Sequence, residues 1–591
     1  MASVTKYVMN SPTDIVTDML QGFVVANPSL RLYPDQKVVL SHPLPQSRVR
    51  ILSGGGSGHE PFAAGYVGDG MLSGAVAGNI FTSPPSASIE AALEALSKDN
   101  SAGVLVVVAN YTGDVLNFGI ACERVKAQGH KVESVVVGED IALLDTDRTS
   151  IAGRRGMCGI VLVIKIAGAM AAESISVENI AKECKEVSSS MSTLGVCLSA
   201  CSMPGSGPMF TLETDQMDLG LGIHGEAGIC RTKLESASAV VQTLLDKISR
   251  SLDLKENRSV VVLVNNLGTL TQLEMGVVQK EIAEYFDRQH ISIARLYSSS
   301  FMTSLDMKGF QVCVLRLDNP KWVKWLDGDT VASGWPRSTR GVKEEHESLV
   351  LSGAKSFEQI YEENKTEWNS IKTHQRDLVA QCLRVAAECV SSQEDELNRL
   401  DQTCGDGDCG STLKRLAQVV LELLSGSGPQ SEAYTSSPVT ILKFLEYSAQ
   451  TRMGGTSGAL YSLFFLAAAS HVQKNRKNWN WAEAFVTGVE GVLRFSAARK
   501  GDRTMLDVLI ECKENLEQIP KDGKLVLSKD ALTRIQTNVT RACEDTRTMT
   551  PRAGRASNVD ASLIHNVDAG AYGAQVWITA IIDELLKRFN S

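Results

Sequence analysis

Three aspartates stand close together in the segment 401–410, which reads Asp-Gln-Thr-Cys-Gly-Asp-Gly-Asp-Cys-Gly. Asp401, Asp406 and Asp408 repel one another unless a cation neutralises them. Carboxylate oxygens are ligands that suit Mg²⁺ or Ca²⁺, and the glycines leave backbone N–H groups free to approach an anion. The segment therefore predicts a site for a metal-bound phosphate. The alternative is an exposed acidic turn that caps a helix beginning at Ser411.

A glycine-rich segment, 53–61, follows a predicted strand and reads Ser-Gly-Gly-Gly-Ser-Gly-His-Glu-Pro. Glycine loses more conformational entropy on folding than other residues, so this density favours close approach of the backbone to a small ligand. His59 closes the loop. The segment 110–114, Asn-Tyr-Thr-Gly-Asp, also follows a strand and offers Asn110 and Asp114 to a ligand. Its alternative role is a helix cap, in which Asp114 accepts hydrogen bonds from free N–H groups.

A third glycine loop, 219–226, reads Leu-Gly-Leu-Gly-Ile-His-Gly-Glu and holds His224. Its glycines match the G-x-G-x-x-G fingerprint of dinucleotide-binding domains. That interpretation is rejected, because no β-branched strand precedes the loop and no long amphipathic helix follows it closely. A histidine among glycines is better explained as a reactive or ligand-touching imidazole, although a lone loop histidine is more often structural.

Three further polar loops precede helical patterns in the second half of the chain: 453–458, 501–504 and 566–570. Glycines and hydroxyls at a helix N-terminus can bind an anion through backbone N–H groups and the helix dipole. For 453–458 the alternative is a tight helix–helix contact that needs small residues. Each loop lies where a helical bundle would turn, so all can meet at one end. No G-x-x-x-x-G-K-[ST] string occurs, which excludes a standard P-loop.

The 591 residues exceed the size of a single core and predict two or three domains. A formal net charge of −9 argues against general nucleic-acid affinity. The 13 cysteines form no disulfide framework and fit a reducing compartment. No signal peptide and no apolar run long enough to span a membrane are evident. We therefore expect a cytoplasmic protein that binds neither membrane nor nucleic acid.

The pattern of short β-branched runs and helices changes along the chain. Residues 1–336 alternate strands with helices, which predicts an α/β domain, with two subdomains split near 195. Predicted strands include 49–52, 104–108, 132–137, 259–264 and 311–317, and 156–171 predicts a buried helix. The charged segment 337–370 predicts a linker with one helical stretch. Residues 371–591 predict an all-helical domain, with long amphipathic runs at 376–400, 439–450 and 481–499.

Together these segments resemble the single-chain, ATP-dependent dihydroxyacetone kinase family, including its triokinase/FMN cyclase type. The resemblance covers nearly the whole chain, in the family's order of substrate domain, linker and nucleotide domain. It rests on the strings 53–61, 110–114, 153–156, 219–226, 405–410, 454–458, 501–507, 554–557 and 568–570.

The resemblance implies a mechanism. His224 would add through a ring nitrogen to the ketone of dihydroxyacetone and form a hemiaminal, which selects carbonyl substrates over glycerol. Asp114 would accept the proton of the attacking hydroxyl, and His59 would hydrogen-bond to the substrate. The substrate pocket would also include Gly56, Ser57, Gly58 and Asn110.

The resemblance also implies a nucleotide site in an eight-helix barrel. Asp401, Asp406 and Asp408 would hold two Mg²⁺ ions that bridge the phosphates of ATP. The other nucleotide contacts would be Gly407, Asp408, Cys409, Gly410, Thr456, Ser457, Arg503, Thr504, Asp568, Ala569 and Gly570. Family members of this type are homodimers, so a homodimer is expected.

Three functions remain open. The first is a kinase for dihydroxyacetone and glyceraldehyde. The second is a lyase that cleaves FAD to cyclic riboflavin phosphate and AMP, with Mn²⁺ or Co²⁺ as candidate metals. The third is a non-catalytic regulatory or binding protein of the same fold, against which the full set of predicted catalytic residues argues. Many family members have lysine where this chain has Ala109, which predicts weaker substrate binding or a shifted preference.

Overall fold

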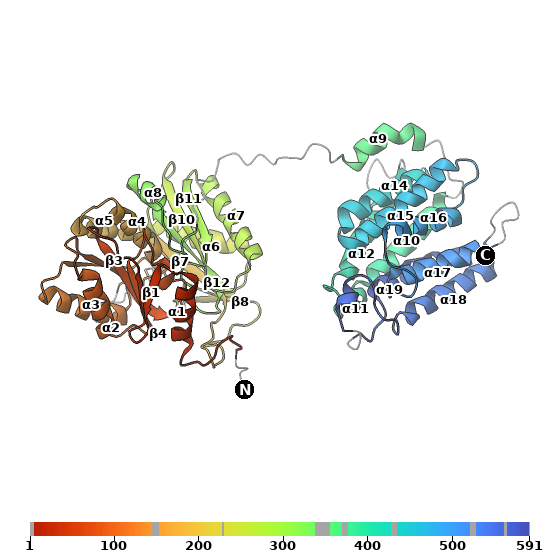
Figure 1. Cartoon of the computed structure of the whole chain (residues 1–591). Helices are drawn as coiled ribbons and strands as arrows, with labels where there is room; N and C mark the ends of the chain where they lie inside the picture. Colours follow the sequence, from red (N-terminus) through yellow and green to blue (C-terminus); the bar gives the residue numbers. More distant parts are fainter. Residues whose placement is uncertain are drawn as a thin grey trace. The chain divides into compact units, whose positions relative to one another are not determined.

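A computed structural model describes residues 5–144, 153–226, 228, 230–336, 355–368, 376–426, 434–435, 437–519, 527–560 and 564–589. The chain forms two compact units, Met1–Ser348 and Leu349–Ser591, whose elements are labelled in Figure 1. The first unit is α/β and the second is all-helical, which confirms the predicted fold class. Within the described ranges no helix is both long and apolar enough to cross a bilayer.

The first unit contains two six-stranded sheets. The strand order in the first is β1 (Leu30–Tyr33), β2 (Val38–Ser41), β4 (Gly74–Ile80), β3 (Arg50–Ser57), β5 (Val104–Ala109) and β6 (Val132–Val137). β4, β3, β5 and β6 are parallel neighbours, and β1 and β2 add an antiparallel edge. β3 lies between β4 and β5, so the strand that follows it in the sequence pairs with one of its edges and the next strand pairs with the other edge. The loops after β3 and β5 therefore border a crevice at the carboxyl ends of the strands, where α/β sheets bind ligands.

The two faces of this sheet are covered by different helices (Figure 1). Alternate residues of β5 point to opposite faces, since side chains alternate along a strand. Val104, Val106 and Val108 pack with α2 (Ser86–Ser97) and α3 (Thr112–Ala127). Leu105 and Val107 face the core that contains α4 (Ile160–Ala172) and α5 (Val177–Ser189). The short helix α1 (Ile15–Ala26) adds Val16 and Leu20 to that core.

The second sheet shares this core. Its strand order is β11 (Ser292–Ser299), β10 (Ser259–Asn266), β12 (Lys308–Arg316), β7 (Met191–Ser199), β8 (Gln216–Leu219) and β9 (Cys230–Lys233). Leu263 and Leu315 face α4, and the other side packs on α6 (Ala237–Ser251) and α7 (Gln272–Arg288). The short α8 (Lys321–Leu326) contributes Trp322. Because α4 is surrounded by apolar neighbours, every one of its residues except the last is buried, as the small-residue pattern at 156–171 predicts.

The helical unit comprises α9 (Phe357–Trp368), α10 (Arg376–Ser392), α11 (Glu394–Asp401), α12 (Cys409–Leu424), α14 (Pro438–Ser448), α15 (Gly455–Lys474), α16 (Trp481–Phe495), α17 (Met505–Glu517), α18 (Lys529–Asp545) and α19 (Ala569–Lys587). Its main core joins residues of α10 to α19. The run 376–400 is two helices rather than one, because the chain departs from helical geometry at Gln393.

Helix α9 lies in the segment 337–370, whose other residues are mostly outside the described ranges. Phe357, Tyr361 and Trp368 of α9 are buried in an aromatic cluster with Tyr434, and Val439 of α14 belongs to the same cluster. The Trp368 carbonyl also accepts a hydrogen bond of 2.7 Å from the Ser437 hydroxyl. The described part of this charged segment is thus an integral helix of the second unit.

Candidate functional site: a histidine pocket and a carboxylate cluster

The loop after β3 brings its backbone close to neighbouring segments. A Cβ at Gly54 would lie 2.2 Å from the Val76 carbonyl oxygen, and one at Gly56 would lie 2.7 Å from the Thr82 nitrogen. Gly58 has a φ of +98° and abuts the Phe81 ring. Part of the glycine density therefore serves packing of the protein against itself. The Ser57 hydroxyl is likewise engaged, since it donates to the Gly78 carbonyl at 2.8 Å.

His59 is buried and held in one orientation. Its Nδ1 lies 2.7 Å from the Thr303 carbonyl oxygen, and a carbonyl can only accept a hydrogen bond, so Nδ1 carries the proton. Nε2 then holds the lone pair, and no hydrogen-bond partner for it is found among the described residues. Burial, together with the nearby His224, lowers the pKa of His59 to about 3. His59 is therefore a neutral imidazole that offers Nε2 as an acceptor.

His224 lies beside His59, although 165 positions separate them in the sequence. The two ring centroids are 4.8 Å apart, and Phe81 and Tyr111 also meet the His224 ring edge-on, at 5.2 and 4.8 Å. The Ser304 hydroxyl donates to the Ile223 carbonyl and so ties this loop to the Thr303 segment. The His224 side chain keeps 23% of its surface exposed, which leaves it accessible to a small substrate.

The loop that carries His224 is not a dinucleotide fingerprint. The short strand β8 precedes it but is antiparallel to both neighbours, and the next regular element is the strand β9. Among the described residues between this loop and β9, no helix begins that could bind a pyrophosphate. The structure thus agrees with the rejection of that motif.

Asp114 lies in the first turn of α3, at the crevice. Its Oδ1 accepts a hydrogen bond of 2.6 Å from the Ser83 hydroxyl, and it lies 3.9 Å from where a Cβ of Gly55 would be. Burial raises the pKa of Asp114, while the Ser83 hydrogen bond and His224 oppose the rise. A carboxylate with a raised pKa is better suited to accept a proton. The alternative role of helix cap is not seen, since the N-cap residue is Tyr111 and no side chain caps the helix there.

Asn110 stands at the end of β5, where its amide donates to the Arg154 carbonyl at 2.7 Å. The structure therefore brings His59, His224 and Asp114 together in one cluster of side chains, and Asn110 adjoins it through Tyr111, whose ring meets that of His224. Tyr111, Phe81, Ser83 and Glu226 also belong to it and were not predicted. Tyr111 and Glu226 lie inside the strings at 110–114 and 219–226, whereas Phe81 and Ser83 follow β4, where the sequence gives no motif.

The three aspartates of the second unit converge at the start of α12. One ligand oxygen from each of Asp401, Asp406 and Asp408 lies within 4.8 Å of the others. Asp401 Oδ2 accepts hydrogen bonds from the Gly407 and Asp408 nitrogens, at 2.9 and 3.1 Å. Asp406 forms an ion pair with Arg555, which lowers its pKa. Hard oxygen donors at this spacing fit Mg²⁺. The alternative of an acidic turn before a helix is also compatible with the structure, since Asp408 is the N-cap residue of α12, although its side chain makes no cap hydrogen bond.

Arg503 and Asp568 join two of the polar loops at this place. The Arg503 side chain is wholly buried, with Nη1 3.7 Å from Asp568 Oδ2 and Nη2 donating to the Asn566 carbonyl at 2.8 Å. Arg503 Nη1 also contacts Cys404 Sγ at 3.9 Å. Burial raises the pKa of Asp568 to about 6 against the effect of Arg503, and Asp401 adds to the rise. The two loops and the acidic segment therefore share one electrostatic environment.

The remaining predicted nucleotide contacts lie around this cluster. Thr504 caps α17 in a capping box with Asp507. Burial, together with the neighbouring aspartates, raises the pKa of Cys409 to about 12, so its thiol stays protonated. Arg415 links the loop of Thr456 and Ser457 to the cluster, because Nη2 donates to the Met453 carbonyl and to Thr412 Oγ1 at 3.1 and 2.8 Å.

Gly454 and Gly455 have positive φ values, and a Cβ on either would meet nothing within 4 Å. This open backbone is typical of an anion-binding loop. The alternative of a tight contact holds at Gly458, where a Cβ would lie 2.7 Å from the Ala449 carbonyl oxygen. Gly410 is likewise closely packed, since a Cβ there would lie 2.1 Å from the Glu394 carbonyl. Ala569 and Gly570 begin α19 directly after Asp568, which accepts from the Ala571 nitrogen at 2.8 Å.

Comparison with known proteins gives a consistent result. The Dak1 domain model matches residues 21–333 and the DAK2 domain model matches residues 403–583. The chain is 38% identical to the triokinase/FMN cyclase of Homo sapiens in an alignment of 590 positions that covers 98% of this chain and 99% of that protein.

The chain is also 33% identical to the dihydroxyacetone kinase of Citrobacter freundii, over 96% of this chain and 97% of that protein. A crystal structure of the C. freundii enzyme with AMP-PNP and Mg²⁺ is similar at a TM-score of 0.63 and 30% identity. That likeness covers 99% of this chain and 100% of the solved one.

Proposed function

Because the chain belongs to the dihydroxyacetone kinase family that combines a Dak1 with a DAK2 domain, we propose that it phosphorylates dihydroxyacetone and glyceraldehyde at the expense of ATP. The observation that carries the proposal is the meeting of His59, Asp114 and His224 in one cluster of side chains. The carboxylate cluster of the helical unit supplies the second requirement, a site for the metal-bound triphosphate.

His224 is the nucleophile toward the substrate carbonyl in this proposal. Addition of a ring nitrogen to the carbonyl carbon gives a hemiaminal and fixes the substrate, which removes much of the entropic cost of the later transfer. Phe81, Tyr111 and His59 surround the ring and limit its rotation. Glycerol has no carbonyl and would not be held this way.

Asp114 and His59 act on the substrate hydroxyls. Asp114, with its raised pKa, accepts the proton of the attacking hydroxyl. His59 is neutral and accepts a hydrogen bond at Nε2, because Nδ1 already donates to Thr303. His59 thus orients the substrate but has no proton to give at Nε2.

The helical unit holds the nucleotide. Asp401, Asp406 and Asp408 fit two Mg²⁺ ions, which neutralise phosphate charge when bound. Thr456, Ser457 and the backbone of Gly407 to Gly410 stand at helix N-termini, where N–H groups suit phosphate. Arg503, Thr504 and the loop 568–570 complete the site. Asp406 must exchange Arg555 for metal when it binds.

A second activity, cleavage of FAD to a cyclic riboflavin phosphate and AMP, is supported by the relative named triokinase/FMN cyclase. This reaction would use the helical unit alone, with Mn²⁺ or Co²⁺ as metal. We expect it to survive in His224→Ala, and loss of both activities in a folded variant would contradict the separation. A homodimer is expected as well, and sedimentation velocity would test it.

The kinase proposal is tested by ATP consumption with dihydroxyacetone, glyceraldehyde and glycerol. Wild type should turn over the two carbonyl compounds and not glycerol. His224→Ala should lose this turnover, whereas the matched variant His130→Ala, in the same unit but after α3, should keep it. Equal turnover of glycerol and dihydroxyacetone by wild type would refute the hemiaminal mechanism.

A further inference from the structure

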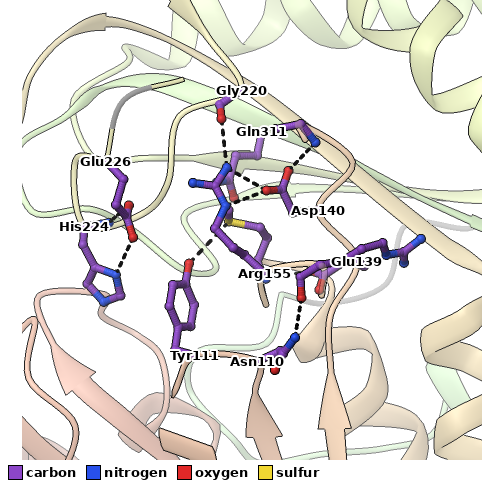
Figure 2. Close-up of polar contacts among 12 residues, drawn as sticks. Asn110, Tyr111, Glu139, Asp140, Arg155, Gly220, His224, Glu226 and Gln311 are labelled. Carbon is purple, nitrogen blue, oxygen red and sulfur yellow. Dashed lines mark hydrogen bonds and ion pairs between the residues drawn. The ribbon is translucent and has the colours of Figure 1, made fainter. Parts of the chain in front are cut away.

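Three charged side chains behind His224 have no role in the mechanism above. Figure 2 shows Glu226 beside the His224 ring, with Arg155 next along and Asp140 beyond it. Arg155 and Asp140 come from the segments that follow β6, about 70 to 85 positions before His224. All three are well shielded from solvent except for part of Glu226.

Glu226 holds His224 at two points. Its Oε1 lies 3.2 Å from His224 Nδ1, and its Oε2 accepts from the His224 backbone nitrogen at 3.1 Å. Burial would raise the pKa of Glu226, but its hydrogen bond with His224 and the charge of Arg155 oppose this and lower it, so that Glu226 is ionised. An ionised carboxylate can only accept, so Nδ1 carries the imidazole proton and Nε2 keeps its lone pair.

Arg155 lies on the far side of Glu226, where its charge favours the ionised carboxylate. Its Nε donates to Asp140 Oδ2 at 2.7 Å and its Nη2 donates to the Gly220 carbonyl at 2.9 Å. Arg155 and Glu226 meet next to Gly222, where a Cβ would lie 1.8 Å from Glu226 Oε2 and 2.7 Å from Arg155 Nη1. Gly222 thus leaves the space through which the two charges face each other.

We propose that Asp140, Arg155 and Glu226 form a positioning relay that presents Nε2 of His224 to the carbonyl substrate. Asp140 orients Arg155, Arg155 holds the start of the histidine loop at the Gly220 carbonyl and places its charge near Glu226, and Glu226 fixes the tautomer and the ring. All three act through His224 in this proposal, so they are positioning residues. The reaction that His224 performs is taken from the proposed function. The effect of the three residues on the His224 ring is inferred from their geometry alone.

The relay also balances charge during addition. The Nε2 lone pair forms a bond to the carbonyl carbon, and the C=O π pair moves onto oxygen. The ring becomes cationic beside the ionised Glu226, and it then loses its Nδ1 proton to solvent water. The alkoxide takes one proton from water, so no net proton or electron is gained or lost. Glu226 stabilises the cationic stage, as a carboxylate does for any imidazolium.

A merely structural role is a poor explanation for this arrangement. Burying several charges is expensive, and apolar side chains of similar size hold a loop equally well or better. The Ser304 hydroxyl already fastens the loop at Ile223. A carboxylate placed on one ring nitrogen of a histidine is the arrangement that sets its tautomer.

The sharpest test is Gly222→Ala, which inserts a methyl group between Arg155 and Glu226 and changes no charge. The matched control is Gly119→Ala on α3, where a Cβ meets nothing within 4 Å. Two rates are measured: kcat/KM for dihydroxyacetone, and acylation of His224 by diethyl pyrocarbonate, followed by peptide mass spectrometry. We expect both to fall about 10- to 100-fold, the range for losing a hydrogen bond to a charged group, while KM for ATP and the control variant stay unchanged.

Arg155→Lys gives a second test that keeps the charge but loses the forked geometry. Its control is Arg295→Lys, because Arg295 lies on β11 and forms an ion pair with Asp327, which is not part of the histidine loop. A fall of both rates in Arg155→Lys only supports the relay. Unchanged or increased acylation of His224 in folded Gly222→Ala and Arg155→Lys overturns it. If wild type does not phosphorylate dihydroxyacetone, the proposed function fails, and the acylation rates still decide the relay.

Discussion

The buried, neutral state of His59 makes the α/β unit sensitive to acid in a way that one substitution should remove. In the unfolded chain His59 takes up a proton near its ordinary pKa of 6.5, whereas in the folded unit its pKa is about 3. Between these values the unfolded state binds more protons than the folded state. Stability from this residue is therefore complete above pH 6.5 and is lost as the pH falls toward 3.

The magnitude follows from the two pKa values. Each pH unit within the window removes about 1.4 kcal/mol of unfolding free energy, so lowering the pH from 6.5 to 5 removes about 2 kcal/mol through His59. His59→Asn abolishes this titration. Its amide N–H takes the place of the Nδ1 donor to the Thr303 carbonyl, so the loop keeps its main hydrogen bond.

Hydrogen exchange measured by mass spectrometry suits the full-length chain, because peptides from β5 and β10 report on the α/β unit separately from the helical one. After correction for intrinsic exchange rates, wild type should lose about 2 kcal/mol more than His59→Asn between pH 7 and pH 5. Other titrating groups contribute equally to both proteins and cancel. An equal loss in the two proteins would refute the burial argument and the assigned tautomer with it.

Three further outcomes are expected. Lys165→Met should raise the stability of the α/β unit at pH 7, because burial of the charged lysine is unfavourable and lowers its pKa to about 8. Calorimetry should show this gain disappearing near pH 10.5, where the lysine of the unfolded chain also loses its proton. Asp401→Asn should weaken Mg²⁺·ATP binding at least about tenfold by titration calorimetry, because Asp401 also holds the Gly407 nitrogen, with dihydroxyacetone binding unchanged. Ala109→Lys should strengthen dihydroxyacetone binding, with a shift of the backbone at Gly156, which abuts Ala109. Unchanged kinetics in a folded variant would contradict the importance of this position.

Much of the histidine pocket was predictable because each of its principal residues directly follows a strand or lies in a glycine loop. A strand that ends in such a loop needs no tertiary information to be noticed. The meeting of His59 with His224 could not be predicted from pattern, since they belong to different sheets that pack on α4. Phe81 and Ser83 were missed for a related reason, because their role depends on β4 lying beside β3 rather than on any local signal.

In the carboxylate cluster the sequence predicts which residues meet, but not the cationic partners that surround them. Its three aspartates are close in sequence, so local spacing predicts their proximity, and the structure bears this out. Arg503 and Asp568 become partners only when α17 and α19 pack together, and Arg555 reaches Asp406 from a distant turn. The break at Gln393 was missed because apolar periodicity continues through it and hides a change in backbone direction.

The aromatic side chains of α9 have a practical consequence for dissecting this protein. The matched DAK2 region begins at residue 403, and a fragment starting there, or at 371, would lack Phe357, Tyr361 and Trp368. Each aromatic side chain buries roughly 150–250 Å². The fragment would therefore expose an apolar patch of roughly several hundred Å² around Val439, and patches of that size promote self-association. A fragment of the helical unit should therefore begin before α9 at Phe357, and not at residue 403 where the matched DAK2 region begins, if it is to stay monomeric in solution.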